Sequence, residues 1–348
     1  MKRLLLALVA LLVLGGLAGA AWIFVGLERP YKGYPQAETF VEIPAGSGPA
    51  AMGRRLEQAG VVRSAAEFRA AVWMRGAGQR LQAGEYRFDA PLSAAQVVDR
   101  IARGDVFLLP VTFREGLTIR QMSAIFESKG FGPAAAFVRA ASDASLISDL
   151  DPGATDLEGY LFPDTYTLAR KTTAPQLVAR MVAGFKRALT PENRERAAAQ
   201  GLSVRALVTL ASLVEKETAK AEERPIVAAV YLNRHKIGMG MQADPTVIYA
   251  LERAGQYSGN LTRENLRFDS PYNTYRYAGL PPGPIAAPGR ASLDAAANPA
   301  DVPYLYFVSR NDGSHVFAAT LKEHNANVYQ YQVLYFRQQR AARSPGRR

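Results

Sequence analysis

The 348-residue chain contains no cysteine, which excludes disulfide bridges, thiolate chemistry and zinc sites built on cysteine. It has only three histidines, His235, His315 and His324, so a histidine-rich metal centre is not expected. Any reaction that the chain performs must therefore rest on carboxylates, hydroxyls, amides and basic side chains.

Acidic residues are the scarcer charged class, with 31 Asp and Glu against 42 Lys and Arg, which gives a net charge of +11. Such a balance favours anionic partners. The arginines are nevertheless scattered along the chain, and they gather only in a basic tail at 336–348, which we interpret as a solvated, frayed end. In the absence of a basic motif, we expect no nucleic-acid partner.

A long uncharged run from Leu4 to Leu27 follows Lys2 and Arg3. A helix needs about 20 apolar residues to span a bilayer, whereas the apolar core of a secretory signal has roughly 7–15. We therefore expect residues 1–27 to form a single-pass transmembrane anchor, with the rest of the chain outside the cytoplasm. The alternative is a signal peptide cleaved near Ala18-Gly19-Ala20, and both interpretations export the body of the chain.

The next part of the chain reads as a linker at 28–37 followed by strands and helices. Alternating residues predict strands, and amphipathic periodicity with a candidate N-cap at Ser93 predicts helices. The predicted strands are 39–43 and 81–88, and the predicted helices are 50–59 and 93–102.

A weak internal repeat occurs at a spacing of 70 residues. Val41–Gly46 aligns with Val111–Gly116, and the matches continue with Met, Glu and Gly at 52, 57 and 60 and again at 122, 127 and 130. Each unit reads as a strand, a glycine turn, a helix and a glycine stop. Residues 38–150 are therefore expected to form a small α+β region of strand–helix units.

The second half of the chain differs, with helical patterns at 174–188, 203–219 and 224–236 and a long aromatic loop at 255–292. Structured loops of this length often bind ligands.

Glu215 and Glu217 lie near the end of the 203–219 helix, about 160° apart on the two flanks of its apolar face. A carboxyl beside apolar side chains has a raised pKa, which suits a general acid. The same spacing also describes an exposed helix end, and it does not choose between the two glutamates.

Further polar residues follow that could hold sugars through amide, carboxylate and aromatic groups. They are Gln242, Asp244, Asn273 and Tyr275. A structural interpretation exists for each, since Asp244 could be an N-cap with Pro245 in the first turn, and the loop residues could simply pack.

Taken together, these segments resemble the YceG-like family of endolytic murein transglycosylases. The resemblance rests on blocks in the family's order: Gly159–Tyr166, Leu210–Thr218, Gln242–Tyr249, Tyr272–Tyr275, Gly279–Gly283, Pro303–Val308 and His324–Asn325. It implies an α+β fold with an N-terminal transmembrane helix, a LysM-like region at 38–150 and a larger mixed α+β catalytic domain at 155–335.

The resemblance also implies the site and the setting. Glu217, the second glutamate of Glu-x-Glu, corresponds to the family's catalytic glutamate, and Glu215 with the four polar residues above would orient it and the sugars. The family's members act at the bacterial cytoplasmic (inner) membrane, cleave nascent peptidoglycan within the strand and terminate glycan polymerisation. The implied partners are glycan strands, the membrane and proteins of wall synthesis.

A single carboxylate can perform this reaction because the C6 hydroxyl of MurNAc is a tethered nucleophile. Ordinary glycosidases use two carboxylates. No metal or cofactor is required. Two alternatives stay open, a non-catalytic envelope scaffold that binds peptidoglycan and a muramidase in which water attacks.

Overall fold

In the computed structural model of the protein, residues 11, 14, 15 and 25–343 are described. The expected anchor at 1–27 therefore lies almost wholly outside the described residues. Within the described part, no single helix is long and apolar enough to cross a membrane. One helix pair, α8 (Pro191–Ala199) and α9 (Val204–Glu217), passes that test only when taken together, and it bends by 97° at the break.

The fold is mixed α+β and divides into two compact units, residues 1–109 and 110–348. In the first unit, β1 (Thr39–Ile43) pairs antiparallel with β2 (Gly84–Phe88). Three helices complete it: α2 (Pro49–Gln58), α3 (Ala65–Met74) and α4 (Ala94–Arg103). The alternate residues Val41, Ile43, Tyr86 and Phe88 face the helices and are buried. The predicted strands and helices of this unit are thus present, and Ser93 caps α4 in a capping box with Gln96.

The segment at 28–37 is not the expected linker, because it packs onto the first unit. Leu27 and Tyr34 belong to the core of that unit. Tyr31 forms a β-bridge with Leu92, and the Gly33 N–H donates to the Gly60 carbonyl over 2.8 Å. A side chain at Gly60 would collide with the backbone of Gly33. The end of the uncharged run is therefore fixed to this unit.

The second unit starts with a strand–helix arrangement of its own. β3 (Leu109–Thr112) pairs with β4 (Thr165–Leu168), and the Phe113 N–H donates to the Asp164 carbonyl over 3.0 Å. The helices are α5 (Ile119–Ser128), α6 (Ala134–Ala141), the short η1 (Ala144–Ile147) and α7 (Ala174–Ala188). The expected boundary near 150 differs from this arrangement, because the region at 110–150 shares its core with the helices that follow.

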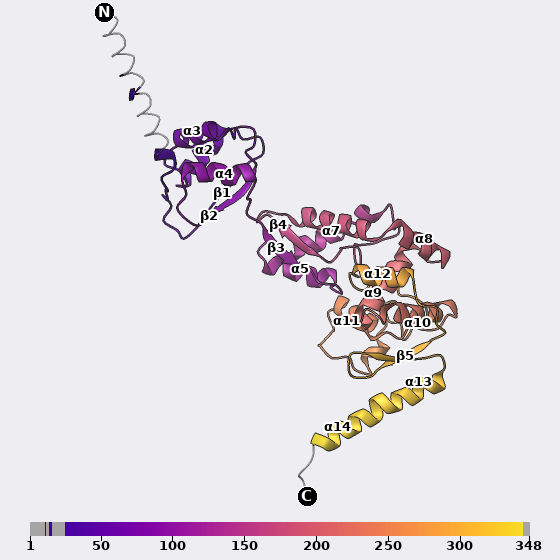
Figure 1. Ribbon diagram of the computed structural model, residues 1–348. Coiled ribbons are helices and arrows are strands. Elements are labelled where there is room, and N and C mark those ends of the chain that lie inside the picture. Colours follow the sequence, from indigo (N-terminus) through magenta and orange to yellow (C-terminus); the bar gives the residue numbers. More distant parts are fainter. Residues whose placement is uncertain (1–10, 12–13, 16–24, 344–348) are drawn as a thin grey trace, which may run out of the picture. The chain divides into compact units, whose positions relative to one another are not determined.

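The 70-residue repeat corresponds to a recurring order of elements, β-α-α-β-α (Figure 1). We call Thr39–Arg103 the first copy and Leu109–Ala188 the second copy. The strand-to-helix turns contain Gly46 at φ 77° and Gly116 at φ 74°, a conformation that favours glycine. Gly60 and Gly130, at φ 69° and 79°, follow the first helix of each copy in the same way.

The rest of the second unit is mainly helical. After α8 and α9 come α10 (Arg224–Lys236), α11 (Asp244–Arg253), η2 (Asn265–Arg267) and α12 (Arg290–Ala297). The antiparallel hairpin of β5 (Tyr306–Ser309) and β6 (His315–Ala318) packs against α13 (Leu321–Val328).

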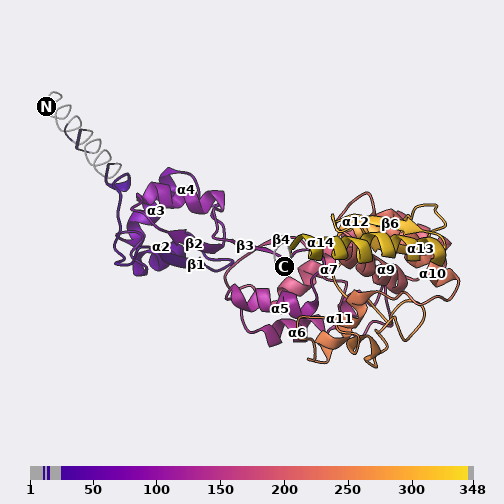
Figure 2. The ribbon, with the colours of Figure 1, turned by 90° about the horizontal axis from the view of Figure 1, so that it is seen from below.

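Helix α13 continues through a π-helical segment, η3 (Tyr329–Leu334), into α14 (Tyr335–Arg343), and the three form one long rod (Figures 1 and 2). The part of the basic tail that is described, up to Arg343, is therefore helical rather than frayed.

Candidate active site

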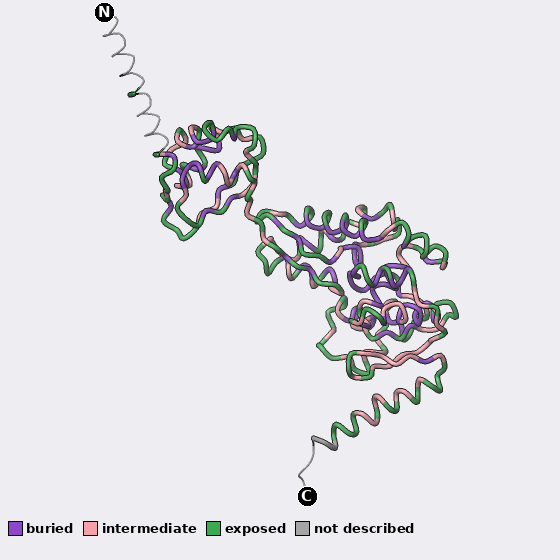
Figure 3. Tube along the Cα trace, viewed as in Figure 1, coloured by how far each residue is buried: buried purple, intermediate pink, exposed green. Residues whose placement is uncertain are grey.

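Helix α9 places Glu215 and Glu217 at the end of a buried rod. Ser203 caps its N-terminus, and all eight residues from Leu207 to Val214 are buried (Figure 3). A helix that is apolar on all sides belongs inside a core, and α9 contacts α8, α10, α11 and α12. The helix ends at Glu217 because the next residue, Thr218, is extended. The two glutamates therefore lie at the edge of the core, just after its buried helical residues.

A set of hydrogen bonds fixes the chain after Glu217. The Thr218 hydroxyl donates to Glu223 over 3.1 Å, and the Glu223 carboxylate accepts from the His315 N–H at 2.8 Å and contacts its Nδ1 at 2.7 Å. Burial alone would raise the pKa of Glu223, but these bonds hold it below its ordinary value. The charged Glu223 carboxylate thus links the start of α10 to strand β6.

Glu217 is the acid of the site whose carboxyl has one oxygen without a hydrogen-bond partner among the residues that the structure describes. Its Oε2 is fully buried and has no hydrogen-bond partner within the described residues. Burial raises the pKa of its carboxyl, and the negative charge of Asp244 adds to the rise. The Tyr231 hydroxyl and the electrostatic influence of His315 and Arg234 oppose this rise without cancelling it. A carboxyl in such surroundings retains its proton closer to neutral pH, as a general acid must.

Glu215 has a different environment, although it is only two residues away. Its Oε2 accepts the Gly289 N–H over 2.9 Å, and its Oε1 faces the Arg224 guanidinium at 3.8 Å. The structure thus separates two glutamates that helical periodicity left equivalent. Glu215 is bound to the start of α12, whereas Glu217 is available for chemistry.

Both glutamates line one cavity of about 600 Å³. The two sides of this cavity come from segments about 100 residues apart, the end of α9 and the turn after β3. The lining residues are Arg114, Glu115, Glu215, Lys216, Glu217, Thr218, Ala219 and Arg224. The Nε of Arg224, like Oε2 of Glu217, is buried without a hydrogen-bond partner among the described residues. The cavity therefore offers an acid and a cationic donor to a polar ligand.

Glu115 is a site residue that the sequence did not single out. Burial and the negative charge of Glu215 raise the pKa of its carboxyl, and Arg224 opposes the rise. Its side chain lies against Gly289, where an added Cβ would come within 1.8 Å of Oε1. Lys216 holds the turn in place by donating to the Gly116 carbonyl over 3.3 Å. One signal was available in the repeat, since Arg114-Glu115 occupies the position of Pro44-Ala45.

Two of the predicted binding residues, Asp244 and Tyr275, lie close enough to Glu217 to interact with its charge, although they are not among the residues that line the cavity. The Tyr275 hydroxyl donates to Asp244 Oδ1 over 2.6 Å, and the pKa of each of Glu217 and Tyr275 responds to the charge of Asp244. Asp244 is the first residue of α11, after Ala243 at the N-cap position, so it is not the cap itself. Its carboxylate is exposed and available to hydroxyl groups.

Gln242 is also exposed, and its backbone adopts φ 48°. A positive φ is uncommon for a residue other than glycine and marks a constrained position. Its N–H donates to the Thr274 carbonyl over 3.2 Å, so the segments before α11 and around Tyr275 are joined. The exposed Gln242 amide therefore extends from a fixed backbone.

Asn273 differs from its expected role, because its amide is already occupied. The side chain is fully buried, its Nδ2 donates to the carbonyls of Leu266 and Phe268, and its Oδ1 accepts the Tyr275 N–H. Asn273 therefore orders the long loop and positions Tyr275 rather than contacting a sugar itself.

Comparisons with known proteins give the family of the chain. The YceG-like family matches residues 41–330. The endolytic murein transglycosylase of Bacillus subtilis is 30% identical over 329 residues, which cover 90% of each chain. That of Streptococcus pneumoniae D39 is also 30% identical, over 94% of this chain but 64% of the longer relative. The crystal structure of a yceG-like protein from Listeria monocytogenes has 32% sequence identity and a TM-score of 0.57, and it covers 83% of this chain and 98% of that one. The chain therefore belongs to the YceG-like family.

Proposed function

We propose that this protein is an endolytic murein transglycosylase in which Glu217 is the acid and base. The family and the names of its relatives supply the reaction class. The observation that carries the assignment of Glu217 is its buried Oε2, which has no hydrogen-bond partner among the described residues, together with the place of Glu217 in the lining of the cavity. Burial raises the pKa of the carboxyl and so favours its protonated form, and an Oε2 without a partner in the described part of the chain is left for the substrate.

The proposed reaction uses one carboxyl twice. Glu217 first donates its proton to the oxygen that links MurNAc C1 to GlcNAc, and that C–O bond breaks. The C6 hydroxyl of the same MurNAc then bonds to C1, and the Glu217 carboxylate accepts the proton of that hydroxyl. The products are a GlcNAc end and a 1,6-anhydro-MurNAc end, with no water consumed. Because the nucleophile is tethered to the reacting carbon, a second carboxylate is not needed to activate water.

The neighbouring residues take positioning roles in this proposal. The Asp244–Tyr275 pair and the exposed amide of Gln242 offer acceptors and donors to sugar hydroxyls. Arg224 offers a buried N–H inside the cavity, and Glu215 holds Arg224 and the start of α12 in place.

We further propose the setting that the sequence predicts. Residues 1–27 would anchor the protein in the bacterial cytoplasmic membrane with the body outside, and strand cleavage there would terminate glycan polymerisation. The strand–helix–helix–strand order of the first unit supports a LysM-like region, which we now limit to the first copy, Thr39–Arg103, rather than to residues 38–150. Glycan strands are the proposed substrate, and wall-synthesis proteins are candidate partners.

The test compares the wild type with Glu217→Gln on purified glycan strands, with the product ends identified by mass spectrometry. Glu195→Gln, at an exposed glutamate of α8, is the matched control. We expect anhydro ends from the wild type and the control, and release from Glu217→Gln that is slower by about 100-fold or more. Reducing ends alone would show a muramidase, and unchanged cleavage by Glu217→Gln would reject the assignment of the acid.

A further inference from the structure

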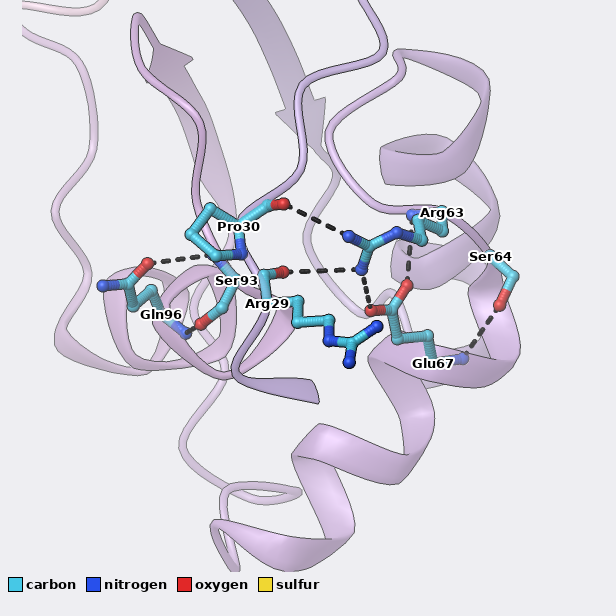
Figure 4. Close-up of polar contacts among 7 residues, drawn as sticks. All are labelled: Arg29, Pro30, Arg63, Ser64, Glu67, Ser93 and Gln96. Atoms are coloured by element: carbon cyan, nitrogen blue, oxygen red, sulfur yellow. Dashed lines mark hydrogen bonds and ion pairs between the residues drawn. The ribbon is translucent and has the colours of Figure 1, made fainter. Parts of the chain in front are cut away.

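Helix α3 of the first unit is tied at both ends to the residues that directly follow the uncharged run. Before its first turn, the Arg63 guanidinium donates to the carbonyls of Arg29 and Pro30 over 3.4 and 3.2 Å (Figure 4). The same guanidinium pairs with Glu67 of α3 over 3.0 Å. At the other end of the helix, Arg75 pairs with Glu28 over 3.0 Å. The whole of α3 is therefore held beside residues 28–30.

The outer face of α3 is apolar and contains a strongly exposed tryptophan. Ala66, Ala70 and Trp73 lie at i, i+4 and i+7, so they share one side of the helix. Trp73 is 83% exposed, more than any other large apolar side chain described, and the adjacent Met74 is 38% exposed. An isolated exposed leucine needs no explanation, but a tryptophan left in water at the end of an apolar stripe does.

The same stripe borders a hollow of about 560 Å³ that reaches the end of the uncharged run. Gly26 and Leu27 line it from the run, and Ala66 and Ala70 line it from α3. Leu27 is itself 3% exposed and belongs to the core of the unit. There is thus no flexible spacer between the run and α3.

We propose that the outer face of α3 lies in the interfacial layer of the membrane, with Trp73 among the lipid headgroups. The proposal rests on the proposed anchor at residues 1–27, since a span that ends just before the buried Leu27 places residues 28–30 near the bilayer surface. Helix α3, tied to those residues, is then at the same level. Tryptophan favours that level because its ring is apolar and its N–H can still find a hydrogen-bond partner.

The charges around this face point to an anionic lipid surface as the partner. Arg29 borders the hollow, and Arg69 lies one turn before Trp73 on the outer side of α3. Both side chains are exposed. Arginines beside an apolar face are typical of segments that lie on anionic membranes. Contact at α3 would fix the orientation of the first unit on the membrane, which an anchor alone does not do.

The two tryptophans of the chain, Trp22 and Trp73, allow a direct test with the full-length protein. In Trp22→Phe, fluorescence reports on Trp73 alone, and in Trp73→Phe it reports on the expected anchor alone. Each variant is reconstituted into phosphatidylcholine–phosphatidylglycerol vesicles, with and without lipids that carry bromine near the headgroup. We expect brominated lipid to remove about half or more of the Trp73 emission, as for an interfacial ring. We also expect aqueous iodide to quench it weakly.

The outcomes distinguish a failure of the proposed membrane contact of α3 from a failure of the proposed anchor. If brominated lipid quenches Trp22 but leaves Trp73 unaffected and open to iodide, the anchor stands and the inference is wrong. If neither tryptophan is quenched by lipid, the anchor fails as well. If Trp73 is shielded from iodide yet insensitive to brominated lipid, protein covers the face and the lipid proposal is wrong. Arg69→Glu in the Trp22→Phe background should reduce the quenching by lipid, and an equal effect in vesicles without phosphatidylglycerol would contradict the anionic-headgroup contact.

Discussion

The first and second copies of the β-α-α-β-α arrangement use the same order of elements for different purposes. In the first copy the turn after the strand reads Pro44-Ala45-Gly46, and in the second it reads Arg114-Glu115-Gly116. Both turns reverse the chain at a glycine with positive φ. Only the second turn lines the cavity that contains Glu217. The same backbone turn thus becomes part of the candidate site when its two variable positions carry charge.

The cores of the two copies also differ in how far they extend into the rest of the chain. The core of the first copy consists of its own residues and of Leu27 and Tyr34 from the segment just before it. In the second copy, Phe113, Phe126 and Phe137 belong to one continuous core that includes the buried α9. The second copy is therefore not an independent module but one wall of the catalytic unit.

The largest expected effect is the loss of Glu217, for which neither copy offers a substitute. We expect Glu217→Gln to lower kcat by about 10²–10⁴-fold, the usual contribution of general acid–base catalysis. The glutamine keeps the shape of the side chain, so the unfolding temperature should change little. Steady-state cleavage rates and calorimetry measure the two quantities. A drop in rate with an equal drop in folded fraction would instead indicate a structural role.

Truncating one buried phenylalanine in each copy should show whether the two cores unfold independently. Phe68 in the first copy and Phe137 in the second are both 0% exposed. Phe→Ala at either site should cost about 3–5 kcal/mol in the unfolding free energy of its unit. Because only Phe137 shares the core of α9, Phe137→Ala should also inactivate the enzyme at a lower temperature. Denaturant unfolding and residual activity after heating test this. Equal inactivation by Phe68→Ala would show that the cores are coupled.

Exchanging residues between the two turns tests whether Glu115 contributes to the site. Glu115→Ala copies the first turn, and it removes a carboxylate whose charge acts on Glu215. We expect kcat to fall by about tenfold, the factor that corresponds to about 1.4 kcal/mol of lost transition-state stabilisation. Glu115→Gln should recover part of the loss because it refills the space against Gly289. The control is Ala45→Glu in the first copy, which should leave kcat unchanged.

The smallest effect concerns the starts of the equivalent helices α2 and α5. Helix α2 has no side-chain cap, whereas the first N–H of α5, at Ile119, is bonded by the buried Glu158 over 3.0 Å. Burial raises the pKa of Glu158 from 4.5 to about 8, although the Ile119 N–H and the Tyr249 hydroxyl oppose the rise. The folded protein therefore retains a proton that the unfolded chain releases between these two values. Its stabilising contribution is complete below the ordinary pKa and is lost as the pH rises toward 8.

Glu158→Gln removes this titration and keeps an acceptor for the Ile119 N–H. We expect the unfolding free energy of the variant to fall less than that of the wild type between pH 5 and pH 8. Denaturant unfolding at several pH values measures the slope. Parallel slopes for the two proteins would show that Glu158 is not the titrating group.

Local patterns in the sequence were sufficient to predict several of the helices and the repeat, but not α3, α6, α8 or the helices after α11. The helices at 174–188 and 224–236 have the predicted bounds, and Ser93 caps α4, because apolar periodicity and capping residues act within a few positions. Strand β4 was not predicted, because it is only four residues long and is defined by its pairing with β3, more than 50 residues earlier.

The site could be predicted only in part, for the same reason. The family resemblance selected Glu217, but the difference between Glu217 and Glu215 depends on Gly289 and Arg224, which tertiary folding brings together. Glu115 approaches the cavity from a turn 100 residues before Glu215, and no local pattern shows such a contact. Asn273 looked like a ligand for sugars because its type suits them, whereas its burial assigns its amide to the loop.

The central claim is that Glu217 directs attack by a hydroxyl of the substrate rather than by water. Digestion of purified glycan strands in water labelled with heavy oxygen tests it most directly, with the new ends weighed by mass spectrometry. We expect anhydro-MurNAc ends that contain no solvent oxygen, and their release should be slower by about 100-fold or more with Glu217→Gln. New MurNAc ends that each carry one labelled oxygen would contradict it, because water would then be the nucleophile.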